Sequence, residues 1–239
     1  MRQMRAEVWP RSRITPEHEA EMFRLYETYF ESTSEAIFSE DLASKHSAIV
    51  LFDATERIQG FSTLELIEFE GGRAIFSGDT IVNHEFWGEQ TLPVAWCRYA
   101  GQIKARHKEE PLYWFLISKG YRTYRYLPLF AHAYHPSWRS PTPPETQRLM
   151  DALARRKFGK CYIPAKGVVR FPKSRGQLRE SWAGISPVLR TKPEVRFFLE
   201  RNPGYRRGDE LVCLTELSEA NMRSFARMAF AEGMSSQHV

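Results

Sequence analysis

Side chains able to exchange protons gather in two stretches of this 239-residue chain. Asp79 and His84 lie at or just beyond the end of an apolar stretch, and either could act as a general base. Tyr124 lies in a tyrosine-rich segment and could act as a general acid, with Tyr121 and Tyr126 as alternatives. Each also has an ordinary structural interpretation: a turn acceptor for Asp79, an exposed loop residue for His84, and core rings for the tyrosines.

Two further features suggest a binding site near these residues. Lys119, Arg122 and Arg125 could hold a phosphate or a carboxylate, or could simply be solvated, and a helix would bring the two arginines to one side. The segment Ser77–Thr80 interrupts an apolar strand with small polar residues. A glycine inside a strand, here Gly78, predicts a bulge or a close approach by another backbone or a ligand, or else eases packing against a tryptophan ring.

Other catalytic and metal-binding patterns lack a positive signal. Cys97, Cys161 and Cys213 are far apart, so we expect neither a disulfide framework nor a zinc site. His132 and His135 have metal-compatible spacing, but no nearby residue completes a ligand set. No nucleophile elbow, Walker loop or dinucleotide fingerprint is present. Hydrolase, nucleotide-triphosphatase and dehydrogenase functions are therefore not indicated.

The net charge of +5 is mild, and its small basic concentrations at Arg155–Lys157 and Arg206–Arg207 do not form a long stripe. Nucleic acid is an unlikely partner on this basis, whereas an anionic small ligand or an acidic protein suits the charge equally well. The sequence contains no long apolar stretch or signal-peptide pattern, so we expect no membrane partner and a cytoplasmic location.

Helix and strand patterns alternate along the chain, and they must position the residues above. The patterns predict helices at about 15–30, 34–46, 91–103, 121–135, 142–153 and 218–231, and strands at 47–53, 58–68, 73–82, 111–117, 161–171 and 210–216. A Gly71–Gly72 turn makes the strands on either side of it antiparallel, whereas a crossover helix beginning at a Thr91 cap makes strands 73–82 and 111–117 parallel. Thr142 and Glu145 have capping-box spacing. The expected fold is α/β (α+β), with a mixed, mostly antiparallel central sheet flanked by helices.

This order of elements resembles the Gcn5-related N-acetyltransferase (GNAT) superfamily from about Thr15 to His135. The resemblance implies that two parallel strands, Ile75–Val82 and Leu112–Ile117, part to admit the pantetheine arm of an acyl donor. It also implies that the loop Asn83–Thr91 wraps the donor's pyrophosphate, at a helix N-terminus whose free N–H groups and dipole favour phosphate.

Aminolysis of a thioester needs a base, a hydrogen bond to the carbonyl oxygen and a proton for the departing thiolate. By the resemblance, Asp79 or His84 supplies the base, Tyr124 supplies the proton, and a backbone N–H between Asp79 and Ile81 polarises the carbonyl. The implied donor-binding residues are Thr80, Ile81, Val82, Trp87, Gly88, Lys119 and Arg122.

The loop before the crossover helix departs from the family pattern of Gln or Arg, two residues, Gly, one residue, and Gly or Ala. It has one glycine, and Glu85 and Glu89 would oppose a pyrophosphate. An acyl carrier protein, with its single phosphodiester, is therefore an alternative to acyl-CoA as donor. Aromatic residues around the expected cleft would suit an acyl chain longer than acetyl: Phe86, Trp87, Trp96, Trp114 and Tyr121.

The sequence thus predicts a GNAT-like core at 1–135 and a C-terminal extension at 136–239 that packs on the same domain and could complete the sheet and the acceptor site. The expected activity is transfer of an acyl group from acyl-CoA or an acyl carrier protein to an amine or hydroxyl of a small acceptor, with no permanently bound cofactor. A non-catalytic module that binds an anionic ligand or a partner peptide is the alternative.

Overall fold

The computed structural model describes residues 4–236 and divides into two compact units. The first comprises the chain up to Thr28, Ser34–Trp114 and the chain from Glu216 onward, and the second comprises Tyr29–Thr33 and Phe115–Thr215. The predicted C-terminal extension contributes to both units, because its last segment belongs to the first. Within residues 4–236, no helix combines the length and apolarity needed to cross a bilayer.

The first unit is built on an antiparallel meander whose strands follow the order β1 (Arg5–Pro10), β3 (Ser47–Phe52), β4 (Ile58–Phe69) and β5 (Gly72–Val82). Every residue of β3 is buried, as expected of a strand covered on both faces. The turn between β4 and β5 has Gly71 at φ +91°, a conformation that L side chains rarely adopt. The hairpin predicted at Gly71–Gly72 is confirmed.

Strand β6 (Leu112–Ser118) begins beside β5 and runs in the same direction. The Arg73 N–H donates to the carbonyl of Pro111 at 3.0 Å, and four residues later on β5 the Ser77 hydroxyl accepts from the indole of Trp114 at 2.9 Å. The residue numbers rise together on both strands, so the predicted parallel pair is confirmed. Helix α3 (Thr91–Arg106) makes the crossover. Its N-cap is Gln90, without a side-chain capping bond, rather than the Thr91 expected from sequence.

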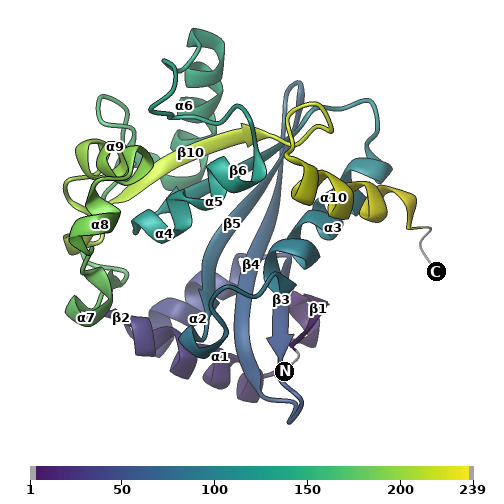
Figure 1. Ribbon diagram of the computed structural model, residues 1–239. Helices are drawn as coiled ribbons and strands as arrows, with labels where there is room; N and C mark the ends of the chain where they lie inside the picture. Colours follow the sequence, from purple (N-terminus) through teal and green to yellow (C-terminus); the bar gives the residue numbers. More distant parts are fainter. Residues whose placement is uncertain (1–3, 237–239) are drawn as a thin grey trace. The chain divides into compact units, whose positions relative to one another are not determined.

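Helices cover both faces of this sheet (Figure 1). On one face lie α1 (Pro16–Tyr29) and α2 (Glu35–Ala43), with Phe38 of α2 against Phe61 of β4 at 5.9 Å between ring centroids. Leu64, three residues along β4, points to the other face and pairs with Ser77, whose hydroxyl meets Trp96 of α3. Helix α10 (Ser224–Ser235) lies beside α3 (Figure 1).

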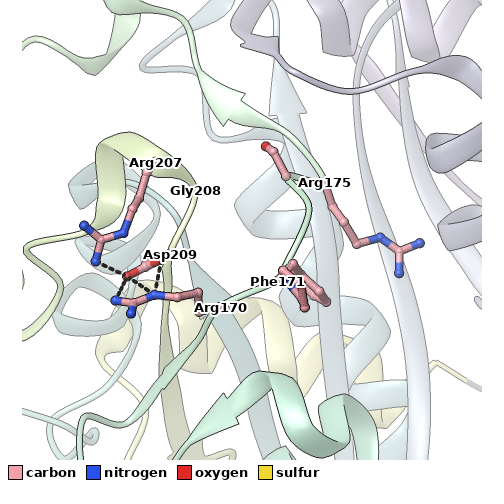
Figure 2. Close-up of a pocket in the computed structure, with 8 residues that line it drawn as sticks. Arg170, Phe171, Arg175, Arg207, Gly208 and Asp209 are labelled. Atoms are coloured by element: carbon pink, nitrogen blue, oxygen red, sulfur yellow. Dashed lines mark hydrogen bonds and ion pairs between the residues drawn. The ribbon is translucent and has the colours of Figure 1, made fainter.

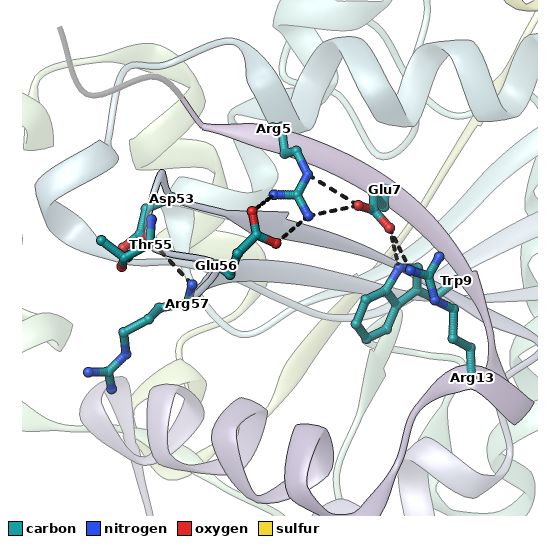
Figure 3. A network of polar contacts seen from close by, with 8 residues as sticks. All are labelled: Arg5, Glu7, Trp9, Arg13, Asp53, Thr55, Glu56 and Arg57. Atoms are coloured by element: carbon teal, nitrogen blue, oxygen red, sulfur yellow. Dashed lines mark hydrogen bonds and ion pairs between the residues drawn. The ribbon is translucent and has the colours of Figure 1, made fainter.

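Strand β1 was not predicted, because charged and apolar residues mix in it without clean alternation. It pairs with β3 along its full length. A surface network also ties it to the β3–β4 turn: the Arg5 guanidinium binds the carboxylates of both Glu7 and Glu56, and Glu7 also accepts from the Trp9 indole at 2.8 Å (Figure 3).

The second unit continues from the later residues of β6 to β10 (Glu210–Glu216), then to the short antiparallel strands β8 (Val168–Val169) and β7 (Tyr162–Ile163). A separate two-stranded ribbon pairs β2 (Phe30–Glu31) with β9 (Gln177–Leu178). The helices of this unit are α4 (Tyr121–Tyr124), α5 (Tyr126–Phe130), α6 (Pro144–Phe158), α7 (Glu180–Ala183), α8 (Pro187–Arg190) and α9 (Pro193–Arg201).

Several predicted elements differ in detail. The strand expected at 161–171 is the β7–β8 hairpin, which turns at Gly167 with φ +65°. The helix expected at 121–135 is two short helices separated at Arg125. Pro143 occupies the N-cap of α6 without a side-chain bond, so the predicted capping box is wrong. Helix α10 begins at Ser224, six residues after its predicted start, and α7–α9 were not predicted. The fold class, a mixed and mostly antiparallel sheet flanked by helices, is confirmed.

Helices α3 and α10 approach so closely that two glycines are required between them. A Cβ atom on Gly233 would lie 2.0 Å from the carbonyl oxygen of Arg98, and one on Gly101 would lie 2.0 Å from that of Phe230. We predict that Gly233→Ala lowers the free energy of unfolding by about 2–3 kcal/mol, because backbone must move to admit the methyl group. Denaturant unfolding measures this. Gly184→Ala, at an open position with φ −62°, is the control and should change stability by less than about 0.5 kcal/mol.

Candidate functional site

A β-bulge interrupts β5 at the segment singled out from sequence. Ser62 of β4 pairs with Thr80 and Leu64 pairs with Ser77, so two steps along β4 correspond to three along β5. The extra residue falls at Gly78 and Asp79, opposite Thr63. The bulge predicted from Gly78 is therefore confirmed. Such an insertion bends a strand and changes the direction of the side chains that follow it.

Gly78 is required by its neighbours on β4 and after α2. A Cβ atom there would lie 2.5 Å from Thr63 Oγ1 and 2.7 Å from Lys45 Cε. These close neighbours replace the tryptophan rings that the sequence suggested as an alternative. The Lys45 side chain is fully buried, and its Nζ donates to Asp41 Oδ2 at 2.6 Å and to Ser44 Oγ at 3.0 Å. A lysine so enclosed requires hydrogen-bond partners for its charge, and α2 provides them.

Ser77, immediately before the bulge, links three elements. Its Oγ accepts from the indole N–H groups of Trp96 on α3, at 3.1 Å, and of Trp114 on β6, at 2.9 Å. The two indole rings lie 4.7 Å apart, and both are nearly fully buried. Beyond the bulge, the hydroxyls of Ser62 and Thr80 share a hydrogen bond of 2.8 Å. This end of β5 is thus held by side-chain hydroxyls as well as by the backbone ladder.

The two proposed bases lie at the carboxyl end of β5. Asp79 is half-buried within the bulge. His84 is exposed at the start of a 3-10 helix (His84–Phe86), with its ring 6.4 Å from that of Trp87 in an edge-on arrangement. Ile81 is buried between them, while Thr80 and Val82 are half-buried.

The loop between β5 and α3 is ordered by its own hydrogen bonds. The Asn83 side chain accepts from the Glu85 N–H at 3.2 Å, and the indole of Trp87 donates to the Val82 carbonyl at 2.9 Å. Trp87 is 45% exposed. Gly88 is also exposed and has φ +100°, so a side chain there would be strained.

The N-terminus of α3 has few free backbone N–H groups with which to bind a pyrophosphate. Thr91 and Leu92 have backbone N–H groups to offer, but the next residue, Pro93, has none. The Thr91 hydroxyl donates to Glu89 Oε2 at 3.5 Å, so a carboxylate already lies at the positive end of the helix.

In the second unit, Tyr124 has no exposed surface and its hydroxyl donates to the carbonyl of Pro136 at 2.9 Å. Its ring lies 6.1 Å from that of Tyr134 and 5.9 Å from that of Phe198. Burial raises the pKa of Tyr124 far above its ordinary value, so the phenol stays protonated at any physiological pH. The environment is that of a core tyrosine.

The cations near Tyr124 are engaged with protein groups. Lys119 Nζ lies 3.6 Å from Glu210 Oε1, and its side chain is only 12% exposed. Arg122 donates to the Trp182 carbonyl at 2.8 Å and lies over the Tyr121 ring. A ligand phosphate would have to compete with these contacts.

The predicted site residues therefore fall into two groups. Asp79, Thr80, Ile81, Val82, His84, Trp87 and Gly88 follow one another along the end of β5 and its loop, all in the first unit. Lys119, Tyr124 and Arg122 follow β6 in the second. The cleft expected between Asp79 and Ile117 stays a prediction.

Sequence reasoning missed Lys45, Ser62 and Thr63, although the polar Ser62–Thr63 pair within an apolar strand mirrors the Ser77–Thr80 segment. Among the described residues, no three His, Cys, Asp or Glu side chains gather as a metal site would require.

Comparison with known proteins gives no match to any family model or curated protein. Solved structures that are similar to part of the chain include proteins described as N-acetyltransferases. They include the Escherichia coli N-acetyltransferase YhbS in complex with CoA (14% identity, 49% of this chain, 64% of that one, TM-score 0.35). Another is a probable N-acyltransferase from Enterococcus faecalis, with 21% identity over 54% of this chain and 34% of that one and a TM-score of 0.37. A third is an N-acetyltransferase from Staphylococcus aureus, with 12% identity over 55% of this chain and 85% of that one and a TM-score of 0.37.

The chain spans less than two thirds of the length of the first two of these proteins. Similarity at these TM-scores establishes no activity. The assignments below therefore rest on the strand order, the crossover and the bulge of this chain.

Ser77→Ala tests the hydroxyl that joins β5, α3 and β6. The substitution leaves two buried indole N–H groups without their acceptor, each at a cost of about 1–3 kcal/mol, so we expect a loss of about 2–6 kcal/mol in unfolding free energy. Tryptophan fluorescence should change in the native state as well. Ser140→Ala, at an exposed serine, is the control. Equal stability of the two variants would contradict the role assigned to Ser77.

Proposed function

We propose that the protein is an acyltransferase that moves an acyl group from a thioester donor to an amine or hydroxyl of a small acceptor. The observation that carries the proposal is the bulge of β5 at Gly78–Asp79, on a strand whose parallel neighbour β6 follows through the crossover helix α3. In this arrangement the end of β5 presents polar groups where a donor thioester can lie against backbone N–H groups.

The reaction breaks the thioester C–S bond and forms a C–N or C–O bond. In the proposed assignment, Asp79 or His84 takes the proton of the acceptor as it attacks the carbonyl carbon. A backbone N–H of the segment Asp79–Ile81 donates to the carbonyl oxygen, which becomes negative in the tetrahedral intermediate. The departing thiolate then requires a proton.

Tyr124 is the proposed donor of that proton. Burial keeps the phenol protonated until the thiolate forms, but the raised pKa also makes Tyr124 a weaker acid, so the proposal depends on its proximity to the sulfur and not on its acidity. Its hydroxyl donates to the Pro136 carbonyl, so acting as an acid requires that it exchange this bond for one to sulfur. Tyr121 and Tyr126 are the alternatives from the same segment.

For the donor, we propose acyl-CoA or a phosphopantetheine-linked acyl group on a carrier protein, with Thr80, Ile81, Val82, Trp87, Gly88, Lys119 and Arg122 as contacts. Two features of the loop favour the carrier. Glu89 lies at the N-terminus of α3, and Pro93 removes one N–H from the first turn. Both weaken this helix end for a pyrophosphate more than for a single phosphodiester.

We predict that the purified protein releases free thiol from acyl thioesters only when an amine or hydroxyl acceptor is present. A panel of acyl-CoA and acyl carrier protein donors of several chain lengths, each with and without acceptors, measures this. The carrier-borne donor should give the higher kcat/KM. Equal rates with both donors would remove the argument for a carrier, and donor binding without acceptor-dependent thiol release would favour a non-catalytic module.

Substitution of the proposed bases should lower kcat without loss of folding. Whichever of Asp79→Asn and His84→Gln removes the base should lower kcat by about 10²–10⁴-fold, the usual contribution of a general base. His132→Gln, another exposed histidine, serves as the control and should retain full activity. If both Asp79 and His84 variants kept normal rates, neither residue would be the base.

A further inference from the structure

A pocket of about 280 Å³ lies within the second unit and shares no residue with the site proposed above. Six of its lining residues matter here: Arg170, Phe171, Ser174, Arg207, Gly208 and Asp209. Phe171 and the adjacent proline supply an apolar wall, whereas the other side is strongly charged. The lining as a whole has three arginines and one aspartate.

Asp209 organises the charged side. Its side chain is only 4% exposed, and both its oxygens are engaged by arginines (Figure 2). Arg170 donates from Nε at 3.0 Å and from Nη2 at 2.5 Å, and Arg207 donates from Nη2 to the same Oδ2 at 3.0 Å. Two guanidinium groups therefore converge on one carboxylate, while Arg175 points away from it (Figure 2).

The aspartate is ionised in this setting. Burial alone would raise the pKa of Asp209, but the hydrogen bonds from Arg170 and Arg207 outweigh that effect and lower it. Its single negative charge offsets one of the two guanidinium charges. The pair of arginines therefore keeps a net positive charge that its protein partner does not balance.

The backbone around Asp209 is built to hold this geometry. Gly208 has φ +88°, and this left-handed turn lets the residues on either side of it, Arg207 and Asp209, meet through their side chains. The Asn202 amide donates to the Asp209 carbonyl at 2.7 Å. A Cβ atom on Gly204 would lie 2.1 Å from Asp209 Oδ2, so the carboxylate also depends on that glycine.

The arginines keep donors for a ligand. Asp209 uses Nε and Nη2 of Arg170 and Nη2 of Arg207, which leaves Nη1 of both and Nε of Arg207 without a protein partner among residues 4–236. The side chains are 37% and 61% exposed, respectively, whereas the carboxylate beneath them is buried. An incoming anion thus meets guanidinium groups already held in place, which reduces the entropy lost on binding.

We propose that this pocket binds the phosphate group of a small phosphorylated molecule. Arginine forks match the oxygens of phosphate and carboxylate alike. Phosphate is favoured because its monoester offers three acceptor oxygens for the open donors of the two arginines, Nη1 of both and Nε of Arg207, whereas a carboxylate offers two. The volume accommodates a phosphate with a small substituent against Phe171.

Isothermal titration calorimetry with inorganic phosphate, and with acetate in a parallel arm, tests the proposal. Phosphate should bind saturably and more tightly than acetate, and its affinity should fall with added salt. Arg207→Gln should weaken phosphate binding about tenfold or more, because it removes a charged donor. Arg207 is the more exposed arginine, so the fold should survive its replacement.

Arg206→Gln is the matched control. Arg206 lies in the same turn, but it binds Glu180 at 2.6 Å and does not line the pocket, so its replacement should leave phosphate affinity unchanged. Absence of saturable phosphate binding, equal weakening by both variants, or acetate binding as tight as phosphate would each overturn the proposal. The measurement needs no acyl donor, so its outcome is independent of the acyl-transfer assay.

Discussion

A buried hydroxyl, Ser77 Oγ, is the contact on which the first unit depends. A serine oxygen has two lone pairs, and here each accepts an indole N–H, one from α3 and one from β6. The two tryptophans lie on α3, which is the crossover helix, and on β6, which is the parallel neighbour of β5. Satisfying both indoles in a nearly dry environment fixes the position of α3 and of the start of β6 along β5, because a shift in either would leave a buried donor without an acceptor.

The bulge lies immediately beyond that contact on β5. With Ser77 held on the α3 side, the extra residue at Gly78–Asp79 realigns β5 with β4, so that Thr80 meets Ser62 through their hydroxyls. On the opposite side, the buried stem of Lys45 occupies the space that a side chain at position 78 would need. The strand end is thereby bent and polar within an apolar sheet. A bent, polar strand end is the physical basis for locating acyl-transfer chemistry there.

The second unit organises charge by a different route. The buried Asp209 carboxylate forms ion pairs with Arg170, from a distant part of the chain, and with Arg207, from its own turn. These ion pairs hold both guanidinium groups in fixed positions. Tyr124, by contrast, is enclosed by other aromatic rings and gives its hydrogen bond to a backbone carbonyl. The same unit therefore contains a rigid tyrosine core and a polar pocket with open cationic donors, and these have separate chemical uses.

The sequence by itself determined the elements whose signals are local. Apolar runs and turn glycines predicted β3 to β6, the hairpin at Gly71, the parallel crossover and the bulge at Gly78, because side-chain periodicity and backbone freedom act over a few residues. The two-residue strands β7 and β8 are too short to leave such a pattern.

Tertiary structure alone decided which distant groups meet. Lys45 beside Gly78, the two indoles on Ser77, and Arg170 on Asp209 join residues 19 to 39 positions apart. No local preference encodes such pairings. They arise because burial leaves each polar group a small choice of partners, and only the folded chain determines which partner is within reach.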